Sequence, residues 1–441
     1  MADILPFKGV VYNKEKVKEI EKVVTPPYDV ISKDEQEQFY NLHPCNIIRI
    51  TLGKDLSGDD EKNNKYTRAA DCIRKWLADG TLIKENKDAI YIYEQKYAVK
   101  NGEEKVRKGF IALTSLQDFS SKKILPHEKT LSKPKEDRLQ LMRACNGNSC
   151  QVFALYFDEK KRVDRILDET SSSDPLFDFT DRNGISHRFW SLKDSEKIGL
   201  IQKAMEEKEL LIADGHHRYE TALNYRNEKK EKSKNFTGKE SFNYIAMMFI
   251  NAESEGLTIF PTHRVVNNLN DFNADKILKK IGEYFTVKSF NSGESEKENL
   301  FKKLSEAGEK NPSFGMSIKG SDKFYLLTLD NKKLIDGLFP ENTPAEWKEL
   351  DVVILHTVVI ENILGISKEN QAGEKNIIYV KLENEALKKV KEGDAQIAFI
   401  LNPTKVSQVK NVALKGMRMP QKSTFFYPKL LTGLVMNLFE D

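Results

Sequence analysis

The segment with the clearest chemical potential joins an apolar run to a polar one through a single glycine. Residues 210–213 are apolar, and residues 214–218 read Asp-Gly-His-His-Arg. This pattern predicts a buried strand, a sharp turn and the start of a helix, whose first amides have no acceptor within the helix. The segment therefore predicts a phosphate-binding turn, with Gly215 allowing close approach of the backbone and Arg218 gripping phosphate oxygens.

Three other side chains of this turn have more than one interpretation. Asp214 would repel a phosphate that it faced, so we expect it to hold Mg²⁺, or a hydroxyl or amine of a substrate. His216 and His217 add donors for phosphate, although a histidine pair also fits a surface loop or a zinc site. Zinc is the weaker alternative because adjacent histidines rarely converge on one ion and no CxxC or HExxH motif accompanies them.

A second segment offers an acid. The sequence Leu-Pro-His-Glu-Lys-Thr, residues 125–130, places His127 and Glu128 directly after a proline that fixes the backbone at a turn. A carboxylate in that position can act as a general base on a substrate hydroxyl. From these residues alone, a solvated glutamate in a charged loop is the simpler interpretation.

Two turns near the C-terminus carry lysine and hydroxyl side chains after apolar stretches. Thr404 and Lys405 follow Asn-Pro, and Lys422, Ser423 and Thr424 follow Met-Pro-Gln. Thr404 fits the N-cap of a helix that begins at Lys405. The second turn is suited to binding a phosphate or a carboxylate.

Two further turns present charged side chains on rigid backbone. Asp29 follows two prolines in the sequence Thr-Pro-Pro-Tyr-Asp-Val-Ile, and His263 and Arg264 end the sequence Pro-Thr-His-Arg after a predicted strand. Asp29 suits a binding site and suits a plain turn equally. We expect His263 and Arg264 to line the same cleft as the other motifs.

The elements that position these residues alternate along the chain, which favours an α/β or α+β fold of two or three domains. We expect helices at 62–79, 194–205, 350–364 and 405–415, and strands at 90–97, 109–116, 151–157, 210–213, 243–250, 257–266, 377–380 and 396–401. The strands at 243–250 and 257–266 are interpreted as a hairpin, with its turn at 253–256. Residues 270–335 have the pattern helix, strand, helix, strand, strand.

Composition narrows the class of protein. Of the 441 residues, 39% are hydrophobic and 31% charged, with a net charge of +3, which is typical of a soluble globular protein without a nucleic-acid partner. The sequence shows no signal segment and no long apolar run, so we expect no membrane partner and a cytoplasmic location. The four cysteines form no CxxC pair and are expected to be reduced and packed.

Five separated motifs carry a resemblance to a known family. In order along essentially the whole chain, PPYDVI, LPHEKT, IADGHHRYETAL, PTHR and MPQKSTFFYPK resemble the signature of domain-of-unknown-function family 1015. The chain is also similar to the free serine kinases, which have a ParB/sulfiredoxin-like fold. That resemblance implies that Glu128 is the catalytic base, that the DGHHR segment holds nucleotide phosphates, and that Thr404 and Lys405 contribute to nucleotide binding. Residues 422–424 resemble a Pro-Lys-Thr-Thr turn, with serine at one threonine position.

The resemblance also implies a division of the chain. We expect an N-terminal extension at 1–120, a ParB/sulfiredoxin-like core at 121–266, a small α+β module at 267–335 and a C-terminal α/β region at 336–441 that contributes to the site. This chain departs from the compact kinases in three respects. It is longer, its PHE and DGHHR motifs are further apart, and its last motif continues as Phe-Phe-Tyr-Pro.

These expectations combine into a nucleotide-dependent phosphotransferase. It would use Mg²⁺ and ATP or ADP, and its acceptor would be the hydroxyl of a small metabolite, with free L-serine (or phosphoserine, in reverse) implied by the resemblance. We expect catalytic roles for Glu128, Asp214 and His216, a metal-binding role for Asp214, and substrate contacts from Asp29, His127, His263, Arg264, Lys422, Ser423 and Thr424.

Two other functions are associated with the same fold family. A nucleotide-binding switch of the ParB type is the alternative, although no helix-turn-helix with a basic stripe is visible. A sulfiredoxin-like reductase is disfavoured because histidines stand where its chemistry needs a nucleophilic cysteine. The sequence leaves the oligomeric state open.

Overall fold

The structure is a computed structural model that describes residues 3–99, 102–130, 132–373 and 375–440. The chain divides into two compact units. Unit 1 comprises Met1–Pro126, Thr130–Thr258 and Pro428–Asp441, and unit 2 comprises His127–Lys129 and Ile259–Tyr427. The chain therefore passes from one unit to the other at four points. Two of them, after Pro126 and after Lys129, lie in the segment that contains the PHE motif.

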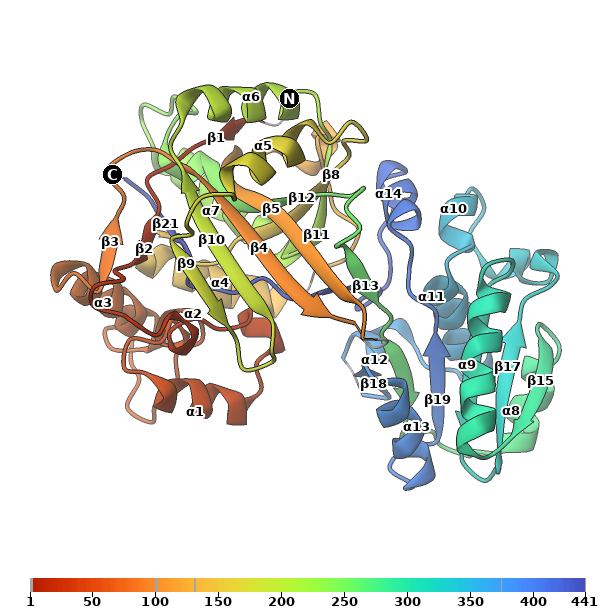
Figure 1. Ribbon diagram of the computed structural model, residues 1–441. Helices are drawn as coiled ribbons and strands as arrows, with labels where there is room; N and C mark the ends of the chain where they lie inside the picture. Colours follow the sequence, from red (N-terminus) through yellow and green to blue (C-terminus); the bar gives the residue numbers. More distant parts are fainter. Residues whose placement is uncertain (1–2, 100–101, 131, 374, 441) are drawn as a thin grey trace. The chain divides into compact units, whose positions relative to one another are not determined.

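One large mixed sheet forms the centre of unit 1 (Figure 1). Its strands are β1 (Ile4–Leu5), β4 (Ile90–Ala98), β5 (Glu104–Ser115), β6 (Ile124–Leu125), β8 (Val152–Tyr156), β9 (Phe177–Thr180), β10 (Ser186–Leu192), β11 (Leu210–Asp214) and β12 (Tyr244–Asn251). Among the described residues these nine strands are ordered β6-β11-β8-β12-β5-β4-β10-β9, with β1 also paired to β5. β11 runs parallel to β6 and β12 runs parallel to β8, whereas the other neighbours are antiparallel.

Helices and two small strand pairs complete unit 1. The helices are α1 (Lys33–Leu42), α2 (Ile48–Thr51), α3 (Lys65–Ala78), α4 (Ser132–Cys145), α5 (Arg162–Thr170), α6 (Ser195–Met205) and α7 (His216–Lys232), with short 3₁₀ turns η1 (Ile20–Lys22), η2 (Tyr28–Val30), η3 (Phe119–Ser121) and η4 (Ser241–Asn243). The strand pairs are β2 (Val10–Tyr12) with β3 (Leu82–Lys84), and β7 (Gly147–Asn148) with β21 (Asn437–Leu438).

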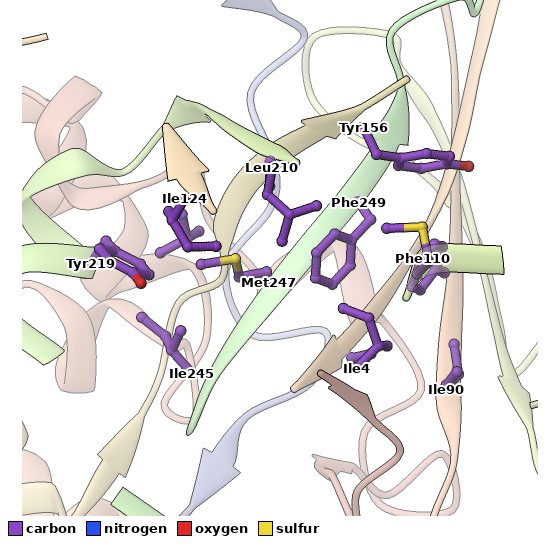
Figure 2. Packing of buried hydrophobic residues seen from close by; sticks show 14 of the residues in the cluster. Ile4, Ile90, Phe110, Ile124, Tyr156, Leu210, Tyr219, Ile245, Met247 and Phe249 are labelled. Atoms are coloured by element: carbon purple, nitrogen blue, oxygen red, sulfur yellow. The ribbon is translucent and has the colours of Figure 1, made fainter. Parts of the chain in front are cut away.

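The main apolar core of unit 1 lies on one face of the large sheet. Side chains from α4, α5, α6 and α7 pack there against the strands. Figure 2 shows part of this cluster, with Tyr219 of α7 beside Ile124 of β6 and Ile245 of β12, and with Phe249 of β12 close to Phe110 of β5. Helix α7 is thereby anchored on the strands, which fixes the position of its N-terminus.

The opposite face of the sheet carries polar and aromatic side chains. Side chains alternate along a strand, so Arg107 of β5 and its register partner Gln95 of β4 lie on the face opposite Phe110. The C-terminal segment of the chain contacts this face. The carbonyl of Pro428 accepts a hydrogen bond from Arg107, and the carbonyl of Lys429 accepts one from Gln95 at 3.0 Å. The last residues are thus a structural part of unit 1.

Unit 2 is built on an antiparallel sheet ordered β15-β17-β16-β19-β14-β18, six strands in the described part of the chain. Its strands are β14 (His263–Val266), β15 (Thr286–Asn291), β16 (Ser313–Ile318), β17 (Lys323–Thr328), β18 (Ile377–Val380) and β19 (Ile397–Leu401), and a separate pair is formed by β13 (Thr258–Phe260) and β20 (Phe425–Tyr427). Its helices are α8 (Ala274–Ile281), α9 (Glu294–Gly308), α10 (Ala345–Lys348), α11 (Asp351–Ile354), α12 (Lys368–Ala372), α13 (Glu383–Lys391) and α14 (Val406–Leu414), with the 3₁₀ segment η5 (Lys332–Leu338) and the π-helix η6 (Leu355–Ile363). Leu300 and Leu304 of α9 and Leu387 of α13 pack on the sheet in a common core.

The mixed α/β class predicted from the sequence is confirmed, whereas the ParB/sulfiredoxin-like topology stays a prediction. The predicted helices at 62–79 and 194–205 correspond to α3 and α6, and Asp194 caps α6. The strand predicted at 377–380 is β18. Among the described helices, none combines the length and the apolar character that crossing a membrane requires.

The predicted hairpin at residues 243–266 is wrong. β12 pairs with β5 and β8 in unit 1, while β14 pairs with β18 and β19 in unit 2. The apolar pattern located the strand at 243–250, but the strand predicted at 257–266 is divided into β13 and β14, and such a pattern does not specify a strand's partner. The connecting residues instead lie where the chain leaves unit 1, and the carbonyl of Gly256 there accepts a hydrogen bond from Tyr97 at 3.0 Å.

Two other expectations also differ from the structure. The apolar helix predicted at 350–364 begins as α11 but continues as the π-helix η6, and π-helical turns are often found at functional sites. The predicted module at 267–335 shares one sheet with strands from the predicted C-terminal region, because β16 pairs directly with β19. The predicted segments are therefore combined in unit 2 rather than separated.

Candidate functional site

The predicted strand–glycine–helix turn is present in unit 1. β11 ends at Asp214, Gly215 has a φ of 91°, and α7 begins at His216. A Cβ atom on residue 215 would lie 2.9 Å from the guanidinium carbon of Arg218. Only glycine therefore satisfies both the left-handed backbone and the close approach of the arginine.

Two cations neutralise Asp214. Its Oδ1 accepts a hydrogen bond from the amide of Gly215 at 2.9 Å, and its Oδ2 lies 3.0 Å from Nζ of Lys429 and 3.7 Å from Nη2 of Arg218. Burial alone would raise the pKa of Asp214, but Lys429 and Arg218 together hold this pKa well below its usual range. The carboxylate is therefore ionised throughout the neutral range.

Arg218 serves this ion pair from a buried position. Burial lowers the pKa of its guanidinium, but Asp214 together with Cys150, Asp29 and Tyr28 more than offsets this, and the net pKa is raised. The guanidinium also donates a hydrogen bond to the carbonyl of Gln151. The first turn of α7 places His216 in a buried position and His217 in a half-buried one. Phosphate contacts by these three side chains stay predictions.

Two basic residues of this cluster were not identified from the sequence. Lys429 holds Asp214 as described, and Arg107 is fully buried over the ring of Phe153, 5.1 Å from its centroid. Among the described residues, Nε and Nη1 of Arg107 have no hydrogen-bond partner. Burial lowers the pKa of Arg107 to about 10, with Asp214 acting in the opposite direction. If the strand predicted at 109–116 were extended back by two residues, Arg107 would be part of it and would lie on the sheet face opposite Phe110.

The surroundings of Asp214 do not fit a resident magnesium ion. Within the described chain, no three His, Cys, Asp or Glu side chains gather in a metal-binding cluster. The carboxylate of Asp214 already faces two cations, which would repel a divalent ion. The role of Asp214 as a magnesium ligand stays a prediction.

Glu128 belongs to a second cluster, in unit 2. Its Oε1 accepts a hydrogen bond from the backbone amide of Lys422 at 3.2 Å. Residue 128 also forms a parallel β-bridge with Met419, whose amide donates to the carbonyl of His127 at 2.7 Å. The structure thus joins the PHE motif to the turn at 419–424, although almost 300 residues separate them in the sequence.

The same cluster collects other predicted site residues. His127 is fully buried, with Nε2 at 3.0 Å from the hydroxyl of Thr424. Ser423 is also buried; its carbonyl accepts a hydrogen bond from the hydroxyl of Thr404 at 3.1 Å. Lys422 has a φ of 57°, which is uncommon for a residue with a side chain.

The proposed capping role of Thr404 is wrong. The N-cap of α14 is Lys405, and the hydroxyl of Thr404 points instead to the turn that contains Ser423. The physical reason is that tying two loops together satisfies the hydroxyl without a cap. Lys405 itself is exposed.

A buried chain of hydrogen bonds from Arg264 through His356 to Gln371 supports the turn that holds Glu128. Arg264 is fully buried; it donates from Nε to Nε2 of His356 at 3.2 Å and from Nη2 to the carbonyl of Gln421 at 3.2 Å. Nδ1 of His356 lies 2.6 Å from Oε1 of Gln371, which can only accept, so Nδ1 carries the proton. Burial, with Arg264 nearby, lowers the pKa of His356 to about 3, and burial lowers the pKa of Arg264 to about 10.

The two remaining predicted residues lie in different units, and Asp29 is close enough to Arg218 to act on the pKa of its guanidinium. His263 is fully buried, and its Nδ1 accepts a hydrogen bond from the amide of Leu401 at 3.2 Å. Asp29 is exposed on η2 in unit 1. Because Glu128 and the phosphate turn belong to different units, their meeting in one site stays a prediction.

A comparison with protein families identifies one match. The family model described as "Protein of unknown function (DUF1015)" matches residues 4–353. No protein with a curated description matches the chain.

Several solved structures have a weak likeness to this one. A conserved hypothetical protein from Pyrococcus furiosus has 12% identity and a TM-score of 0.35, over 75% of this chain and 95% of its own. Free serine kinase in complex with AMP has 12% identity and a TM-score of 0.36, over 72% of this chain and 86% of its own. SbnI from Staphylococcus aureus, truncated at its C-terminus, has 11% identity and a TM-score of 0.35, over 74% of this chain and 87% of its own.

Proposed function

The chain belongs to the DUF1015 family, whose description gives no activity, and from its residues we propose that it is a nucleotide-dependent phosphotransferase acting on the hydroxyl of a small metabolite. The observation that carries this proposal is the strand–glycine–helix turn at Gly215. Its geometry leaves the first amides of α7 without acceptors inside the helix, at the positive end of the helix dipole. Such a turn suits the phosphates of a nucleotide.

The cations around this turn support the same role. Arg107, Arg218 and Lys429 all interact electrostatically with Asp214, and Asp29 acts on Arg218 as well, so the three cations outnumber these two carboxylates. Phosphoryl transfer depends mainly on positioning and on charge neutralisation. In this proposal Asp214 is a positioning residue, since its carboxylate holds Arg218 and Lys429 in place.

Glu128 is the proposed general base. It is half-buried, and the amide of Lys422 holds one of its oxygens at 3.2 Å. The carboxylate takes the proton of the acceptor hydroxyl while the hydroxyl oxygen forms a bond to the terminal phosphorus of the nucleotide. The bond from that phosphorus to the bridging oxygen breaks, and the shortened nucleotide leaves with the electron pair. The mechanism requires the carboxylate to reach the nucleotide phosphates during turnover.

We propose free L-serine as the acceptor and ATP or ADP as the donor. The support is the set of motifs shared with the free serine kinases, which here includes Glu128, the DGHHR segment and the turn at 422–424. Thr404 and Lys405 are proposed to contact the nucleotide, and His127 and Thr424 to shape the acceptor site. The reaction can run in either direction.

A pair of substitutions tests the proposal. Glu128→Gln keeps an oxygen that accepts from Lys422 but cannot take a proton, so we expect turnover to fall by about a hundredfold or more with nucleotide affinity unchanged. Gly215→Ala places a methyl group against Arg218, so we expect it to weaken nucleotide binding instead. Phosphorus NMR with Mg²⁺, each nucleotide and L-serine measures turnover, and calorimetry measures binding.

The outcomes separate the proposal from its alternative. Full activity in Glu128→Gln would overturn the base assignment. Nucleotide binding by the wild type, without phosphoryl transfer to L-serine or to a panel of other hydroxyl metabolites, would favour a nucleotide-binding switch over an enzyme.

A further inference from the structure

Unit 1 contains a small pocket next to the strand–glycine–helix turn at Gly215. Its volume is ≈ 40 Å³, and it is lined in part by Tyr28, Arg138, Asn148 and Arg218. These residues come from η2, α4, β7 and α7, so the PPYDVI and DGHHR motifs meet here. The proposed mechanism leaves Tyr28, Arg138 and Asn148 without a role.

Asn148 is a residue of the pocket lining that carries an unsatisfied donor. The residue is only 4% exposed, and its Oδ1 accepts a hydrogen bond from Asn437 at 3.2 Å. Its Nδ2 is buried and has no hydrogen-bond partner among the described residues. A buried amide without an acceptor costs stability unless a ligand or water supplies one.

Two guanidinium groups add positive charge. Arg138 stacks over the ring of Tyr28 at 4.0 Å, donates to the carbonyl of Thr51 at 2.6 Å and pairs with Asp137. These bonds use three of its five N–H donors. Arg218, which pairs with Asp214, lines the pocket from another side. None of the described residues lining the pocket is acidic.

The size of the pocket limits what it can hold. In the same measure a single water takes about 10 to 15 Å³, so the space corresponds to about three waters. A nucleotide does not fit, but a carboxylate group does. Carboxylates are well matched to guanidinium groups and amide donors, which bind both of their oxygens.

We propose that this pocket binds the carboxylate group of a small organic acid. The assignment of that acid as the acceptor, a hydroxy or amino acid such as L-serine, rests on the phosphotransferase function proposed above. Inorganic phosphate offers similar oxygen acceptors, so the test includes it as a separate arm. The pocket would make the enzyme selective for acceptors that carry a carboxylate beside the reacting hydroxyl.

Calorimetric titration of the full chain, without nucleotide, tests the ligand class. The ligands are L-serine, D-glycerate, ethanolamine and inorganic phosphate; ethanolamine is L-serine without its carboxylate. We expect L-serine and D-glycerate to bind at least about tenfold more tightly than ethanolamine. Equal binding of ethanolamine and L-serine would overturn the proposal, and so would binding of phosphate without binding of either carboxylate.

Substitutions at the pocket test its location. Asn148→Asp keeps the oxygen that accepts from Asn437 but replaces the free donor by a negative charge, so we expect L-serine binding to fall more than about tenfold. Met142→Leu, also in the pocket lining, changes neither volume nor charge greatly and serves as the matched control. If Asn148→Asp lowers the melting temperature, Asn148→Ala removes the donor without adding charge. Unchanged affinity in a folded variant at residue 148 would overturn the proposal.

Failure of this inference is distinguishable from failure of the proposed function. Carboxylate binding that depends on Asn148, without any phosphoryl transfer, would support the pocket and overturn the enzyme. Phosphoryl transfer to ethanolamine as fast as to L-serine would support the enzyme and overturn the pocket.

Discussion

The two units bury their ions in different ways. Unit 1 places Asp214 between Arg218 and Lys429, so that each of these three charges has a partner of opposite sign, whereas the buried Arg107 of the same unit has neutral acceptors. In the described part of unit 2, Arg264 has only neutral acceptors, and the half-buried Asp351 makes no ion pair with a basic side chain. A buried ion with a partner of opposite charge keeps its charge near neutral pH. Burial without such a partner raises the pKa of a carboxyl group and lowers the pKa of a basic group.

The difference indicates two kinds of site. The paired cluster of unit 1 is a fixed scaffold, because its two cations hold the pKa of Asp214 well below its usual range. Arg264 of unit 2 places a positive charge near Glu128. Burial lowers the pKa of Arg264, and the nearby Glu128 partly counters this lowering.

The largest expected effect comes from breaking the pair in unit 1. Asp214→Asn removes the counter-ion of both Arg218 and Lys429, so we expect the free energy of unfolding of unit 1 to fall by about 3 to 5 kcal/mol. Hydrogen exchange with mass spectrometry on the whole chain localises the change. Asp178→Asn, which breaks an exposed pair with Arg188 in the same unit, is the control and should cost less than about 1 kcal/mol. Equal losses in both variants would contradict the comparison.

The isolated carboxylate of unit 2 gives the next effect. Burial raises the pKa of Asp351 from 3.8 to about 7, with the hydrogen bond from Asn402 and the charge of Lys405 acting in the opposite direction. A raised pKa means that this group stabilises the fold below about pH 4 and that the contribution is lost as the pH rises to 7. The shift corresponds to at most about 4 kcal/mol.

Asp351→Asn should therefore stabilise the protein at pH 8 and make little difference at pH 4. Calorimetric melting curves at both values of pH measure this, and Asp336→Asn, at an exposed position of unit 2, is the control. An Asp351→Asn variant that is less stable than the wild type at pH 8 would show that the charged form is favoured in the fold.

The smallest effect comes from adding a buried ion pair at His356 in unit 2. Gln371→Glu places a carboxylate on Nδ1 of His356, so we expect the pKa of His356 to rise from about 3 by one to three units. In the wild type this lowered pKa removes stability as the pH falls from 6.5 towards 3, and the variant should lose less stability by pH 5, by at most about 1.4 kcal/mol. Imidazole NMR titration reads the pKa, with the buried His187 of unit 1 as an internal reference. An unchanged His356 signal would contradict the chain of contacts described here.

Local chemistry in the sequence was sufficient to predict the turn at Gly215. A short apolar run followed by aspartate and glycine specifies a strand, a left-handed turn and a helix, and the structure confirms all three. The periodic apolar segments also identified most strands and helices. Each of these features depends on residues close together in the chain.

Features that depend on long-range pairing were not accessible in the same way. Arg107 and Lys429 meet at one face of a sheet because of strand register and the return of the C-terminal segment, which no local pattern encodes. The same reason explains the incorrect hairpin at 243–266. The role of Glu128 was raised above that of a surface acid only by the motif resemblance, and the contact with Lys422 became visible only in the structure.

The return of residues 428–439 to the first unit has a consequence for biosynthesis. A ribosome releases the strands of the large sheet long before it translates Pro428 and Lys429, which supply a carbonyl to Arg107 and an ammonium group to Asp214. While about 170 residues of the second unit are being synthesised, the nascent first unit therefore has two buried charges that are incompletely satisfied. Translation that stops shortly before Pro428 would leave this half of the protein exposed to proteases and chaperones, even with every residue of the phosphate turn in place.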